Sequence, residues 1–138
     1  MTQEDKDLLL KDLCARLPYS TLCYCKWTKD APNDTSGCVQ EVSTYLLEEL
    51  MIIGDQNYEC QICEIKPYLR PMSSMTKDEE KELGNYLSTE IFLSIDGLHS
   101  VLMAQRHTSN FLYSRHLDVL GLIEKGLAIE APKDMYKF

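Results

Sequence analysis

Hydrophobic residues near the start of the chain recur every three or four positions, at Leu9, Leu10, Leu13, Cys14 and Leu17. Polar residues fill the positions between them, which is the pattern of an amphipathic helix. Thr2 precedes this stretch, with an acidic residue three positions later, the spacing of a capping box. Proline at position 18 disfavours helical geometry in the residue before it. The sequence therefore predicts a helix over residues 3–16.

From residue 19 the helical period disappears, and short runs rich in aromatic, β-branched and cysteine residues follow. Such runs predict strands, here at residues 19–27, 38–46, 47–53 and 58–65. Turn-forming residues separate them at 29–37 and 54–57. For residues 47–53 a helical turn is the alternative. Joined in order, these strands predict a four-stranded antiparallel meander, which would curl into a strongly bent sheet or a small barrel.

The segment at residues 66–80 marks a junction between this strand-rich part and a helix-rich part. Pro67 and Pro71 restrict the backbone to an extended path. Thr76 is followed three residues later by Glu79, a second capping box. A run of acidic residues then falls in the first turn, where the helix dipole favours negative charge. A helix is therefore predicted to start at Thr76.

The remainder predicts short elements. Apolar residues on both sides of Asp96-Gly97 suggest a β-hairpin over residues 91–103, with a continuing helix as the alternative. Residues 109–116 predict a short helix, and Gly121 and Gly126 occupy helix-ending positions in the tail. The predicted fold is α+β in a single domain, residues 1–138. It consists of an N-terminal helix, the small antiparallel four-stranded meander and short C-terminal helices.

Composition narrows the class of protein. A chain of 138 residues with 44% hydrophobic and 26% charged residues is typical of a globular domain. The apolar runs are far too short to span a membrane, and the charged N-terminus does not resemble a signal peptide. We therefore expect a cytoplasmic protein with no membrane association. A net charge of −8 argues against general affinity for nucleic acid backbones.

The six cysteines raise the question of metal binding. In a protein without an export signal they are expected to be reduced. Cys23, Cys25, Cys60 and Cys63 would supply the four thiolates of a structural zinc site. However, positions 60 and 63 point to opposite faces of a strand. Reduced core cysteines are the alternative that we favour, and no cofactor is predicted.

Catalytic and binding residues are both weakly signalled. The densest candidate cluster for catalysis is Ser114, His116 and Asp118, but no nucleophile elbow accompanies it. We therefore expect a solvated polar face here and predict no catalytic residue. Aromatic residues give a better indication of a binding surface, because a curved sheet carrying Tyr and Trp is a common way to bind an extended partner. The candidate binding residues are Tyr24, Trp27, Tyr68 and Arg70.

Three segments resemble a family of short uncharacterised proteins from gut Bacteroidetes and from the phages and mobile elements that infect them. They read KDLCARLPY at 11–19, KPYLRPMSSMT at 66–76 and GLIEKGLAIEAP at 121–132. The resemblance implies no known activity, but it implies a setting in host or phage biology. We therefore expect a non-enzymatic accessory or interaction protein that binds a protein partner or itself. A zinc-stabilised binding module and a small hydrolase or transferase are the alternatives.

Overall fold

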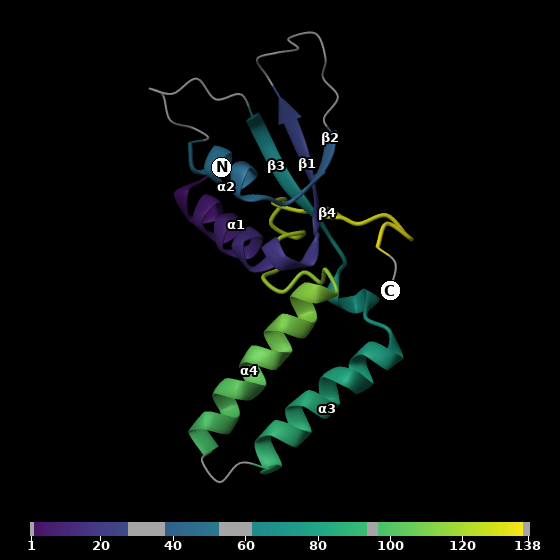
Figure 1. Ribbon diagram of the computed structural model, residues 1–138. Helices are drawn as coiled ribbons and strands as arrows, with labels where there is room; N and C mark the ends of the chain where they lie inside the picture. Colours follow the sequence, from purple (N-terminus) through teal and green to yellow (C-terminus); the bar gives the residue numbers. More distant parts are fainter. Residues whose placement is uncertain (1, 28–37, 53–61, 94–96, 137–138) are drawn as a thin grey trace.

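The computed structural model describes residues 2–27, 38–52, 62–93 and 97–136. Its elements follow in chain order: α1 (Gln3–Arg16), the 3-10 turn η1 (Leu17–Tyr19), β1 (Leu22–Trp27), β2 (Cys38–Glu41), α2 (Thr44–Ile52), β3 (Ile62–Leu69), the 3-10 turn η2 (Met72–Ser74), α3 (Lys77–Leu93), α4 (Gly97–Ser114) and β4 (Ile129–Glu130). The predicted combination of helices and sheet in an α+β fold is confirmed (Figure 1).

The N-terminal helix is confirmed at both ends. The Thr2 hydroxyl accepts a hydrogen bond from the Asp5 backbone N–H at 3.1 Å, and the Asp5 carboxylate accepts one from the Thr2 N–H at 3.5 Å. These bonds occupy N–H groups that the first turn of a helix otherwise leaves unpaired. Leu9 and Leu13 of the apolar stripe are fully buried. The local pattern was sufficient because cap, stripe and terminating proline all agree.

The sheet differs from the predicted meander. Its strand order is β2-β1-β3-β4, with β1 antiparallel to both of its neighbours and β4 parallel to β3. The sheet formed by the described residues is open, so the predicted barrel is not found. The strand expected at 58–65 is β3, displaced to 62–69, and residues 58–61 lie outside the described part. The predicted turns at 29–37 and 54–57 also lie outside it.

The strand predicted at residues 47–53 is wrong, as is the second half of the strand predicted at 38–46, because α2 occupies this stretch. The Ser43 hydroxyl accepts a hydrogen bond from the Leu46 N–H at 3.3 Å and so caps the helix. Leu46, Leu47 and Leu50 form a buried stripe, while Met51 is 61% exposed. Helical spacing of these leucines therefore outweighed the strand propensity of their neighbours.

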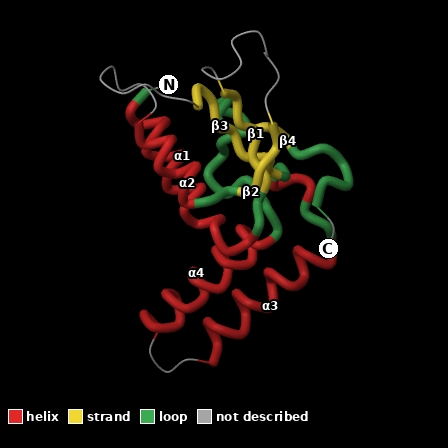
Figure 2. The backbone as a smooth tube through the Cα atoms, turned by 45° about the horizontal axis from the view of Figure 1, so that its top comes forward, coloured by secondary structure: helices red, strands yellow, loops and turns green. Residues whose placement is uncertain are grey.

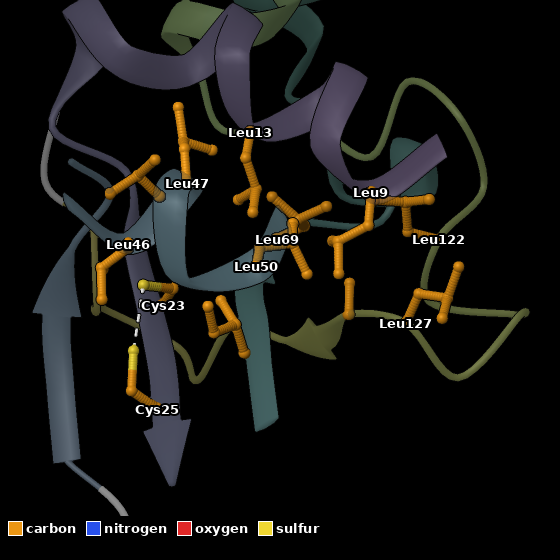
Figure 3. Packing of buried hydrophobic residues seen from close by; sticks show 13 residues of the cluster. Leu9, Leu13, Cys23, Cys25, Leu46, Leu47, Leu50, Leu69, Leu122 and Leu127 are labelled. Atoms are coloured by element: carbon orange, nitrogen blue, oxygen red, sulfur yellow. Dashed lines mark hydrogen bonds between the residues drawn. The ribbon is translucent and has the colours of Figure 1, made fainter. Parts of the chain in front are cut away.

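The main core lies between the sheet and the pair α1 and α2, which cover the same face of the sheet (Figures 1 and 2). Figure 3 shows Leu9 and Leu13 of α1 packing toward Leu69 of β3 and toward Leu122 and Leu127 of the C-terminal tail. The N-terminal helix, the end of β3 and the tail therefore share one core.

The predicted hairpin at residues 91–103 is also wrong. α3 runs to Leu93 and α4 starts at Gly97, while residues 94–96 lie outside the described part. The predicted short helix at 109–116 is the last part of α4, which ends at Ser114. α3 and α4 lie side by side and project away from the sheet (Figures 1 and 2). Gly97 is the first residue of a helix and does not form a turn between strands.

The second capping box is confirmed. The Thr76 hydroxyl accepts a hydrogen bond from the Glu79 N–H at 3.2 Å, and Glu79 accepts one from the Thr76 N–H at 3.0 Å. In the tail, Gly121 and Gly126 have φ angles of +71° and +74°. They close tight turns that lead into β4 rather than ending helices, which corrects the interpretation of the tail.

Candidate binding surface

The sheet has two unlike faces. Alternate residues of β1 and β3 turn inward to the core, among them Cys23, Cys25, Ile65 and Leu69, all fully buried. The residues between them point to the opposite face, as the pleat of a strand requires. We call this the outer face. Its described residues are Leu22, Tyr24, Lys26, Val39, Glu41, Glu64, Lys66 and Tyr68, and each is half-buried or exposed.

Strand register assembles a row of side chains across the outer face. Tyr24 of β1 stands directly opposite Val39 of β2 on one side and Lys66 of β3 on the other. Val39 is 51% exposed, although its neighbour on the strand, Gln40, is half-buried. Directly opposite residues in an antiparallel pair have their Cβ atoms about 5 Å apart, so these three side chains form one continuous strip.

Two of the predicted binding residues share this face. Tyr68 stands one pair further along β3, because Cys23 pairs with Pro67 and Leu22 therefore lies level with Tyr68. Its backbone carbonyl accepts a hydrogen bond from the Tyr136 hydroxyl at 2.7 Å, and its side chain is half-buried. The side chain of Trp27 lies outside the described part of the structure. Sequence reasoning missed Val39 and Lys66, because only the strand register brings them beside Tyr24.

Charge on the outer face is mixed rather than acidic. Lys66 and Glu64 form an ion pair at 3.1 Å with both side chains about one third exposed. Lys26 stands opposite Glu64 on the neighbouring strand. The face therefore offers aromatic and aliphatic contacts at Tyr24 and Val39, with ions of both signs around them. This composition fits a protein surface better than a phosphate backbone.

The fourth predicted binding residue, Arg70, has a structural position instead. Its guanidinium forms a two-point ion pair with Glu79 at 2.7 and 3.0 Å and donates to the carbonyls of Ser74 and Arg115. The hydrogen bond from Arg70 lowers the pKa of Glu79 to about 2. Arg70 also borders a cleft of about 490 Å³ between the junction and the tail residues 130–136. Through Glu79 and the Arg115 carbonyl, the Arg70 side chain connects the junction to α3 and to the end of α4.

The cluster of Ser114, His116 and Asp118 is not the solvated polar face that we expected, because His116 and Asp118 are buried. His116 Nδ1 lies 2.9 Å from the Thr21 hydroxyl, and the imidazole stacks on Tyr136 with 3.8 Å between ring centroids. Burial, together with the charges of Arg16 and Arg70, lowers the pKa of His116 to about 4. Both carboxylate oxygens of Asp118 accept backbone N–H groups, from Leu122 and Ile123. These contacts position the tail and do not form a nucleophile–base pair.

A buried arginine of the first helix, Arg16, connects α1 to the end of α4. Arg16 and Asp12 are fully buried and are in contact at 2.7 Å. Arg16 also donates to the Leu117 carbonyl at 2.7 Å, and its guanidinium carbon lies 4.8 Å from the centroid of the Tyr113 ring. The contact fixes the direction in which α4 leaves the core. Nothing in the sequence pattern indicated the contact between Arg16 and Leu117, because these two residues are 101 positions apart.

Two of the proposed zinc ligands are described. The sulfurs of Cys23 and Cys25 lie 3.7 Å apart in the core. The hydrogen bond to Cys25 and burial raise the pKa of Cys23. Cys60 and the side chain of Cys63 lie outside the described part. Within the part that is described, no group of three or more His, Cys, Asp or Glu side chains is arranged to hold a metal ion.

Comparisons with known proteins give no further guide: no family model, curated protein or solved structure matches the chain. Among the helices described, none combines the length and the apolar character that crossing a bilayer requires.

Proposed function

We propose that this chain is a non-enzymatic interaction protein that binds a protein partner through the outer face of its sheet. The observation that carries the proposal is the strip formed by Val39, Tyr24 and Lys66 on a face that α1 and α2 leave uncovered. Tyrosine contributes strongly to protein interfaces because its ring buries a large area while its hydroxyl stays hydrogen-bonded.

The edge strand adds a second reason for a protein partner. In the described sheet β2 pairs only with β1, so backbone groups on its other side face away from the sheet. An extended segment of a partner can pair with such an edge while its side chains contact the adjacent face. The resemblance to proteins of gut Bacteroidetes, their phages and mobile elements supports a role in host or phage biology.

Substitutions on the outer face provide the test. The chain carrying Tyr24→Ala and Val39→Lys should fold normally. The amount of partner that co-purifies with it from the cells that encode it should fall at least tenfold. Met72→Lys is the matched control, because Met72 is 42% exposed and lies in η2, outside the sheet. Circular dichroism would verify folding of all variants. Equal partner recovery with the double variant and the control would refute the proposal.

A further inference from the structure

Three thiols gather on the inner face of the sheet near its β2 edge. Cys23 and Cys25 are fully buried, and Figure 3 shows their sulfurs in contact beneath the helices. Cys38, the first residue of β2, is half-buried and packs against the same core. Strand register makes Cys38 the direct partner of Cys25. Directly paired residues point to the same face, so these two side chains are neighbours.

The register favours one pairing over the others. Directly opposite residues have Cβ atoms about 4.5–5.5 Å apart, and a disulfide needs about 3.5–4.5 Å. A small approach of β2 would therefore bring Cys25 and Cys38 within bonding geometry. Cys23 pairs with Gln40, which makes it a diagonal neighbour of Cys38 at roughly 7–8 Å. The sulfurs of Cys23 and Cys25 are 3.7 Å apart. These residues are two positions apart on one strand, however, which separates their Cα atoms by about 6.7 Å, near the upper limit for a disulfide.

The sulfurs of Cys38 and Cys25 differ in exposure and in hydrogen bonding. Cys38 is partly accessible, whereas Cys25 is fully buried. The side-chain amide of Gln40 donates a hydrogen bond to the Cys38 sulfur at 3.0 Å. This bond holds the Cys38 sulfur in a fixed position on β2. A dissolved oxidant therefore reaches the sulfur of Cys38 before it reaches the buried sulfur of Cys25.

We propose that Cys38 and Cys25 form a reversible disulfide when the protein meets a hydroperoxide. The Cys38 thiolate attacks hydrogen peroxide, forming an S–O bond, breaking the O–O bond and releasing hydroxide; Cys38 becomes a sulfenic acid. The Cys25 thiol then attacks that sulfur, forming the S–S bond and releasing water. In total, two thiols and one peroxide give one disulfide and two waters. A dithiol reductant reverses the change.

The disulfide would join the edge strand to its neighbour from the core side. Tyr24 and Val39 occupy the opposite face of the same two strands. Oxidation therefore leaves their side chains in place, and the redox chemistry stands independently of the proposed function. Cys14 is exposed on α1 and is not part of the proposed pair, so its alkylation serves as an internal control.

Mass spectrometry of the full chain tests the pairing. After treatment with hydrogen peroxide and alkylation under denaturing conditions, the chain should carry one disulfide, which removes two hydrogen atoms, and four alkylated cysteines out of six. Chymotrypsin cleaves after Tyr24 and so separates Cys23 from Cys25. A cross-linked peptide pair containing Cys25 and Cys38 is expected, and dithiothreitol should release it. A cross-link from Cys38 to any other cysteine, or oxidation of Cys38 beyond the sulfenic acid without a cross-link, would overturn the proposal.

Serine variants give a second, independent result. Cys38→Ser and Cys25→Ser should each abolish disulfide formation, whereas Cys23→Ser and Cys14→Ser should retain it. Persistence of the disulfide in Cys25→Ser would contradict the assignment. If Cys25→Ser does not fold, as judged by circular dichroism, peptide mapping of the unsubstituted chain still decides the pairing.

Discussion

The ion pair between Arg70 and Glu79 should make stability depend on pH in a way that a single substitution removes. The two side chains are only 15% and 9% exposed, so water screens their attraction weakly. Glu79 also accepts the Thr76 N–H that starts α3. Glu79→Gln keeps the size of the side chain and its capping oxygen but removes the charge. The substitution therefore isolates the contribution of the ion pair.

The magnitude follows from the pKa of Glu79, which falls from an ordinary 4.5 to about 2 because Arg70 donates to it. Each pH unit corresponds to about 1.4 kcal/mol, so the charged form contributes about 3 kcal/mol to the free energy of unfolding. Because the pKa is lower in the folded state, this contribution is present above pH 4.5 and is lost as the pH falls toward 2. The Gln side chain retains part of the hydrogen bonding, so we expect a loss of about 2–3 kcal/mol at pH 7.

Urea denaturation followed by circular dichroism at pH 7, 5 and 3 would measure this effect. The difference between the unsubstituted chain and Glu79→Gln should shrink as the pH falls. Glu80→Gln is the matched control, because Glu80 is the exposed neighbour on the same turn and should change stability by less than about 0.5 kcal/mol. A Glu79→Gln effect no larger than that of the control, or one that is constant from pH 7 to pH 3, would refute the reasoning.

Three further predictions follow from the buried contacts. His116 has a pKa of about 4 in the fold, below its ordinary 6.5, so the free energy of unfolding should decline by up to about 3 kcal/mol as the pH falls from 6.5 to 4. His116→Asn should remove this decline from a plot of unfolding free energy against pH, because asparagine tolerates the positive φ angle at this position. Tyr136→Phe removes the hydroxyl that bridges the backbones of β1 and β3 and should cost about 1–3 kcal/mol in urea denaturation, and an unchanged midpoint would contradict the bridge. Gly126→Ala should lower the thermal midpoint, at a cost of about 1–2 kcal/mol, because its φ angle is +74°; Gly84→Ala, in the exposed helix α3, should raise it.

The sequence correctly predicted those elements whose structure depends only on residues close together in the chain. The two capping boxes, at Thr2 and Thr76, were found because cap and acceptor lie three residues apart. The predicted hairpin around Asp96-Gly97 and the predicted strand at 47–53 were wrong. A short apolar run is compatible with both the helical and the strand period, and packing against another element determines which of the two forms. In α2 that surface is α1, against which the leucine stripe packs.

The candidate site was harder to predict because it depends on contacts between distant segments. Tyr24 and Tyr68 were selected from residue type, and the structure brings both to the outer face. Val39 could be added only once β2 was known to pair with β1 in a particular register. Arg70 was listed among the binding residues, but the structure pairs it with Glu79 in the first turn of the next helix. β4 has only two residues and is defined by pairing with β3 alone.

Photo-crosslinking in the cells that encode the chain tests the central claim most directly. A photoreactive phenylalanine analogue in place of Tyr24 should give one discrete, ultraviolet-dependent adduct with another polypeptide. The same analogue in place of the exposed Met72 should give none at comparable expression. Adducts at both positions, or at position 72 alone, would contradict a binding role for the outer face.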